Sequence, residues 1–87
     1  MAEPKMEEIG RVDGFFAHPS VAIIDLTAPL KLGETIYLKG HTTDFQQLVD
    51  SMQVDHAPVQ EAHAGQSVGV KVGNRCRQHD VVYRLVA

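Results

Sequence analysis

Apolar side chains recur at every second position in several short stretches of this chain. In residues 34–40, Ile36 and Leu38 share one face, and more polar side chains occupy the positions between them. Residues 67–72 repeat this period, with three valines on one face. Successive side chains of a strand point to opposite faces, so both stretches are predicted to be strands with one face buried.

Six strands are predicted in all, from this alternation and from runs of β-branched residues: 7–16, 21–26, 34–40, 45–56, 67–72 and 81–86. Gly10 and Gly14 in the first strand predict β-bulges or a close backbone approach. Residues 17–20 are expected to form a turn in which Pro19 fixes φ.

Local signals conflict over residues 43–52. The run from Thr43 to Gln46 fits a capping box, and four apolar side chains share a helical stripe: Phe45, Leu48, Val49 and Met52. That stripe covers only about two turns, and positions 48, 52 and 54 also keep the period of a strand. A strand over 45–56 is the prediction, and a short helix remains the alternative.

A chain of 87 residues makes one domain, here residues 7–87 after a flexible N-terminal segment of residues 1–6. Short strands bury a core by curling, and full closure removes exposed edges. We therefore expect an all-β fold, a six-stranded closed β-barrel.

Composition narrows the class of protein. Apolar residues make up 44% and charged residues 22%, as in ordinary globular domains. No apolar stretch approaches the roughly 20 residues of a membrane span, and the acidic first residues do not resemble a signal peptide, so we expect a cytoplasmic protein without membrane contact. A single cysteine, Cys76, permits no internal disulfide.

Charge is distributed unevenly around the net value of -3. Residues 1–70 hold four Lys/Arg against ten Asp/Glu, whereas residues 71–87 hold four basic residues against Asp80. The four are Lys71, Arg75, Arg77 and Arg84. They could meet phosphate or an acidic partner, but they could equally form a solvated face, and tight non-specific binding of nucleic acid is not expected.

A second candidate binding site is the polar loop that consists of His41, Thr42, Thr43, Asp44 and Phe45. Its donors, acceptors and ring could grip a peptide or a stacked base. The same residues could instead serve a turn, with Asp44 and the threonines bonding local backbone and Phe45 closing the barrel end.

Catalysis and metal binding find little support in the residue pattern. Five histidines stand at irregular spacings without an anchoring pair, so scattered surface histidines are expected, with no metal site and no cofactor. Positive neighbours could lower the pKa of Cys76, but no partner base is evident. No acid–base pair is visible, and we expect the chain not to be an enzyme.

Several motifs together resemble the small stand-alone translation-elongation-factor-like proteins, which are similar to the second domain of elongation factor Tu. They are Gly40-His-Thr-Thr-Asp-Phe45, Ser51-Met-Gln-Val-Asp-His56, the glycine and valine pattern of 62–72, and Asp80-Val-Val-Tyr83. The resemblance implies a Greek-key barrel. The chain has neither the glycine-rich phosphate loop nor the guanine-reading motif, so GTP binding is not carried over.

Two functions follow from the residues and this resemblance. The first is a non-catalytic binding module, related to translation, that contacts an RNA or protein partner through the loop and the basic residues. The alternative is an accessory substrate-binding subunit of an RNA-modifying or collagenase-like peptidase-family enzyme, because a related barrel is appended to that family. The oligomeric state is left open.

Overall fold

The computed structural model describes residues 5–17 and 20–86, and all regular structure within them is β-strand. The strands are, in chain order, β1 (Lys5–Ala17), β2 (Ser20–Leu26), β3 (Leu30–Lys31), β4 (Thr35–Lys39), β5 (Asp44–Leu48), β6 (Met52–Val54), β7 (Ala57–Pro58), β8 (Glu61–Ala62), β9 (Ser67–Lys71) and β10 (Val81–Val86). Neighbouring strands pair antiparallel. The predicted all-β fold is confirmed.

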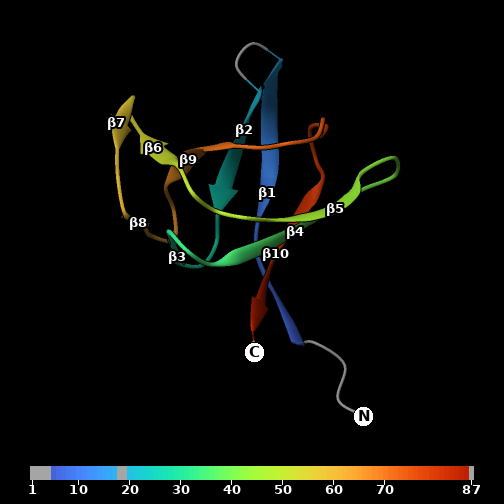
Figure 1. Cartoon of the computed structure of the whole chain (residues 1–87), viewed down its shortest axis with the longest axis horizontal. Helices are drawn as coiled ribbons and strands as arrows, with labels where there is room; N and C mark the ends of the chain where they lie inside the picture. Colours follow the sequence, from blue (N-terminus) through green and yellow to red (C-terminus); the bar gives the residue numbers. More distant parts are fainter. Residues whose placement is uncertain (1–4, 18–19, 87) are drawn as a thin grey trace.

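Strand β1 is the longest strand and lies between β10 and β2 (Figure 1). Its register shifts between Glu8 and Gly10 against β10, and between Val12 and Gly14 against β2. Both bulges predicted from the glycines are therefore confirmed. A Cβ on Gly10 would overlap the carbonyl oxygen of Asp25, so close approach of β2 requires glycine there.

The ends of this first hairpin differ in part from expectation. Strand β1 starts at Lys5, so the last two residues of the segment predicted to be flexible, 5 and 6, pair with β10 instead. Residues 1–4 and the predicted turn residue Pro19 lie outside the described residues.

The predicted strand over 45–56 occurs as two pieces, β5 and β6, and the helix alternative is wrong. Strand β5 pairs with β4, whereas β6 pairs with β9, on the other side of the molecule (Figure 1). A two-residue period can serve both pairings, because each half of the segment needs only one buried face.

Eight strands form one curved sheet in the order β5-β4-β10-β1-β2-β9-β6-β7, and β3 and β8 form a separate pair (Figure 1). The closed six-stranded barrel is not confirmed. Val49 still bonds the backbone of Gly33 and Glu34 beyond the end of β5, but within the described residues no strand pairing joins the edge strands β5 and β7. Within the described residues, β5 has no ladder partner on the side away from β4, where the side chain of Gln47 bonds the backbone of Lys71 and Gly73 instead.

The sheet wraps one hydrophobic core. The two faces predicted for residues 34–40 and 67–72 are confirmed, since their inward side chains are fully buried. The largest buried side chains are Ile9, Ile24, Leu30, Ile36, Leu38, Met52, Val12, Val49, Val68, Val70, Val82 and Cys76. Each buried aliphatic side chain of this size contributes about 1.5–3 kcal/mol.

Candidate functional site

The predicted loop site forms the turn between β4 and β5. The N–H of Gly40 donates to the carbonyl of Thr43 at 2.7 Å and closes the turn. His41 and Thr42 are exposed, whereas Thr43 is only 4% exposed. Of these residues, His41 and Thr42 can therefore reach a partner most directly.

Asp44 and Phe45 make the local contacts that are expected if the loop serves the fold rather than a binding partner. The hydroxyl of Tyr37 donates a hydrogen bond to Asp44 Oδ1. This bond, with smaller effects of burial and of the carboxylate charge, raises the pKa of the Tyr37 phenol. Phe45 is half-buried and packs against the core. These contacts give each residue a role in the fold, and their role in binding stays a prediction.

The structure brings part of the basic group to this loop. Four residues of the loop site, together with Asn74 and Arg75, line one surface hollow: Thr42, Thr43, Asp44 and Phe45. Arg77 lines an adjacent hollow with Phe15 and His79, which Arg75 also borders. Lys71 is exposed at the end of β9. The loop and the arginines of residues 75–77 thus form one polar surface.

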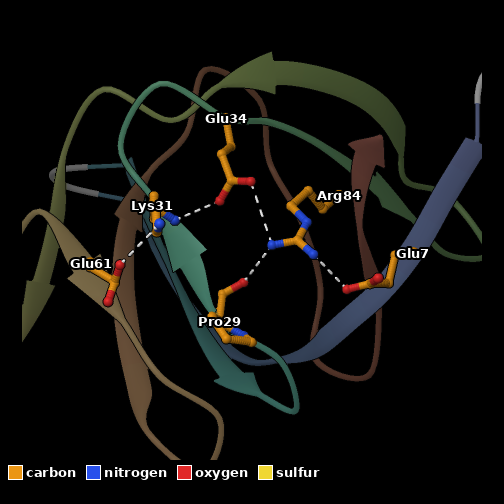
Figure 2. Close-up of polar contacts among 6 residues, drawn as sticks. All are labelled: Glu7, Pro29, Lys31, Glu34, Glu61 and Arg84. Carbon is orange, nitrogen blue, oxygen red and sulfur yellow. Dashed lines mark hydrogen bonds and ion pairs between the residues drawn. The ribbon is translucent and has the colours of Figure 1, made fainter. Parts of the chain in front are cut away.

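Arg84 lines neither hollow, because acidic partners hold its guanidinium (Figure 2). Nη2 lies 2.6 Å from Glu7 Oε1, and Nη1 lies 3.4 Å from Glu34 Oε2. Nη1 also donates to the carbonyl of Pro29 at 3.0 Å. The Arg84 side chain therefore connects β10 to Glu7 on β1 and to Pro29 and Glu34 in the segment between β2 and β4, which gives Arg84 a structural role.

Glu34 extends this network toward β8 (Figure 2). Its Oε1 accepts the backbone N–H of Lys31 at 2.7 Å, and Lys31 Nζ lies 3.4 Å from Glu61 Oε2. Glu61 also lies 3.7 Å from His63 Nε2. Lys31, Glu61 and His63 are well exposed, so these outer contacts contribute little to stability.

Asp80 is a buried carboxylate that sequence reasoning did not select. Its side chain is 5% exposed, and Oδ2 accepts the N–H of Arg77 at 2.8 Å. Its backbone carbonyl accepts the N–H of Val12 at 2.8 Å. Asp80 thereby fixes the loop before β10 against β1. Its place in the run Asp80-Val-Val-Tyr83 was the sequence signal that could have identified it.

Cys76 is buried in the same loop. Burial, and secondly the carboxylate of Asp80, raise the pKa of its thiol to about 11. This raised pKa favours the protonated thiol at neutral pH. The flanking arginines, exposed at 75 and 77, do not offset this effect.

Among residues 5–17 and 20–86, no three His, Cys, Asp or Glu side chains gather closely enough to hold a metal ion. His63 Nε2 lies 3.7 Å from Glu61 Oε1, and His18 lies outside the described residues. The same part of the chain contains no helix with the length and hydrophobicity needed to cross a membrane.

A surface groove on the outer face of β2, β9 and β6 was missed. Apolar side chains of Phe16, Val21 and Ile23 line it together with Gly69, and polar residues complete its lining: Gln53, Asp55, His56 and Ser67. Phe16 is 60% exposed. The signal lay in the run Val21–Ile24, which is apolar on both faces of a strand whose outer face meets solvent.

Comparisons with known proteins place the chain beside peptidase-family sequences. No family model matches. An uncharacterized protease of Methanocaldococcus jannaschii is 46% identical over 79 residues, which are 90% of this chain but 19% of that protein. The chain thus spans about a fifth of the curated relative that it matches.

Two crystal structures of the C-terminal domain of a Geobacillus thermoleovorans protein assigned to the U32 peptidases share the fold. The selenomethionine variant has a TM-score of 0.83 and 19% identity, covering 87% of this chain and 96% of that domain. The other has a TM-score of 0.83 and 18% identity, covering 90% and 91%.

The resemblance to translation-elongation-factor-like proteins is wrong. The sequence match is to a protease, and the structural matches are to a U32 peptidase C-terminal domain. The quoted motifs around Gly40, Gly65 and Asp80 stand in turns or beside strands, and Gly65 has a φ of 89°, which favours glycine. They carried information about fold and none about translation.

Proposed function

We propose that this chain is a non-catalytic accessory β-domain of a peptidase-family protein. It contacts the polypeptide on which a separate catalytic region acts. The observation that carries the proposal is the asymmetry of the sequence match: 46% identity covers 90% of this chain but only 19% of a protein named a protease. A segment that matches so small a share of a larger protein behaves as a module of it.

The chemistry of the described residues supports a non-catalytic role. The buried thiol of Cys76 has a pKa raised to about 11, which disfavours a thiolate. The buried carboxylate of Asp80 is committed to the backbone N–H of Arg77. Arg84 is held between Glu7 and Glu34. These groups stabilise the fold and leave the outer surface for contacts.

A segment exchange tests the proposal. In the Methanocaldococcus jannaschii relative, the 79 matching residues are replaced by this chain, and degradation of a labelled unfolded protein is compared with that by the intact and truncated proteins. We expect the exchange to restore most of the turnover lost on truncation. An unrelated β-domain of similar size in the same position is the control.

The isolated chain is assayed beside these proteins. We expect no cleavage by this chain alone. Cleavage by the purified chain, or an exchange that performs no better than the unrelated β-domain, would contradict the proposal.

A further inference from the structure

The groove on the outer face of β2, β9 and β6 has an apolar floor. Val21 and Ile23 project outward from β2, and Phe16 exposes a large ring beside them. Gly69 leaves the groove deeper at this point, because a Cβ there would fit beside Val21 at 3.4 Å from its Cγ1 and would fill part of the space. An exposed aromatic ring beside a low apolar floor is typical of a site that receives an apolar side chain.

One end of the groove is acidic. Ser67 lines the groove, and its hydroxyl donates to Asp25 Oδ1 at 2.6 Å. Asp55 lines the same groove from the turn after β6. Among the salt bridges of the described residues, none involves Asp25 or Asp55. Arg11 stands opposite Asp25 on β1 and partly offsets its charge, so Asp55 is the carboxylate beside the apolar floor that most strongly attracts a cation.

The turn that supplies Asp55 is strained. Asp55 and His56 have φ values of 52° and 64°, and they form the two-residue connection between β6 and β7. Each left-handed residue with a side chain costs roughly 1 kcal/mol, and glycine avoids this cost. Both side chains line the groove. Positive φ at both positions is what a two-residue type I′ hairpin turn requires, and this turn places two polar side chains at the groove.

We propose that this groove binds an extended segment of a partner protein that carries an apolar residue and, two residues away, a lysine or arginine. Ile23 and Asp25 are two residues apart on β2, which is about 6.6 Å along a strand. An extended segment repeats its side chains at the same spacing. Its apolar side chain lies over Ile23 and Gly69 while its cation meets Asp25 and Asp55. The inference stands on the groove alone and does not require the proposed function.

Titration of the isotope-labelled chain with capped seven-residue peptides, followed by NMR, tests this. The probe has Leu-Gly-Arg at its centre. The controls have Ser-Gly-Arg, Leu-Gly-Glu, or Leu and Arg as adjacent residues. We expect the Leu-Gly-Arg peptide to bind about tenfold more tightly than each control. Amide shifts should centre on Ile23, Ser67 and Gly69.

Variants connect the binding to the groove. Asp55→Asn should lower the affinity for the Leu-Gly-Arg peptide about fivefold and leave the affinity for the Leu-Gly-Glu peptide unchanged. Asp50→Asn removes an exposed acid outside the groove and should change neither affinity. His56→Gly should raise the urea midpoint, because glycine adopts the positive φ of this position without strain. The same change should lower the affinity for the Leu-Gly-Arg peptide.

Three outcomes would overturn the inference. One is equal affinity for Leu-Gly-Arg and Leu-Gly-Glu peptides. Another is shifts that centre outside the groove or do not saturate. The third is sedimentation of the chain as a dimer that Phe16→Ser dissociates, which would make a second copy the occupant of this face.

Discussion

The α-carbon of Gly40 lies directly against the carboxylate of Asp80. A Cβ on Gly40 would overlap Asp80 Oδ1 and lie 2.6 Å from its Cγ. The carboxylate cannot simply swing away, because it is buried and accepts the N–H of Arg77. The turn after β4 and the loop before β10 therefore meet at a position that tolerates only glycine.

Gly40→Ala should lower the free energy of unfolding by about 2–3 kcal/mol, since it overpacks this contact and strains a buried hydrogen bond. Urea denaturation measures the change. Gly14→Ala is the matched control: a Cβ on Gly14 has no atom within 4 Å, so its effect should stay within about 0.5 kcal/mol. Similar losses in both variants would contradict the proposed contact.

Most strands could be predicted because their signal is local. Alternation in residues 34–40 and 67–72 reports one buried face, whatever the partner strand is. The division of 45–56 into β5 and β6 could not be predicted, because the segment changes partner from β4 to β9 at residues 49–51 while its period continues. Partner choice is a property of the whole sheet, which explains why closure was over-predicted.

The site was predictable to a smaller extent. The loop at 41–45 and Arg75 were selected, and residues 42–45 do line one surface hollow with Arg75. The role of Arg84 was missed because its partner Glu7 is 77 residues away in the chain, and no local pattern records such a pair. The groove was missed because the outward apolar residues of β2 were taken only as β-branched strand formers.

Gln47 connects β5 to the chain at the end of β9 and should matter for stability. Its side-chain Nε2 donates to the carbonyl of Lys71, and its Oε1 accepts the N–H of Gly73, both at 2.8 Å. Gln47→Ala should cost about 1–2 kcal/mol in unfolding free energy and speed hydrogen exchange of the Gly73 amide. Gln46→Ala, an exposed change one residue earlier on β5, should have little effect on either measurement.

If Gln46→Ala and Gln47→Ala were equally mild, the edge strand β5 would be held by β4 and the core alone. Unchanged exchange at Gly73 would give the same answer independently of global stability, because exchange reports local opening.

Arg84 should tolerate no replacement well, lysine included. Its guanidinium reaches Glu7 through Nη2 and both Glu34 and Pro29 through Nη1. Arg84→Met should destabilise the fold by about 1–3 kcal/mol, and Arg84→Lys should lose at least half as much, because an ammonium group cannot reproduce the fork. Urea denaturation at low and high salt measures the loss of unfolding free energy in both variants.

Lys31→Ala is the comparison for this network. The Lys31 side chain is 63% exposed and pairs with an exposed Glu61, so its loss should cost less than about 0.5 kcal/mol. A loss as large as that of Arg84→Met would mean that the outer pairs, rather than the guanidinium, stabilise this side of the sheet.

Cys76 should be unreactive in the folded chain and should make stability fall at alkaline pH. Burial raises the pKa of its thiol from 9.0 to about 11. At pH 8 the folded thiolate fraction is then about 100-fold below that of the unfolded chain, so iodoacetamide should react about 100-fold more slowly before urea is added than after.

The same shift fixes the direction of the pH effect. Because the folded pKa is the higher one, the thiol contributes its full stability below about pH 9, and this contribution is lost as pH rises through about 11. Denaturation of the wild type and of Cys76→Ala, each at pH 7 and pH 10.5, separates the effect of the thiol from that of tyrosine and lysine ionisation, which both proteins share. The wild type should lose more stability than the variant over that range, and equal losses would show that the thiol is already accessible to water in the native fold.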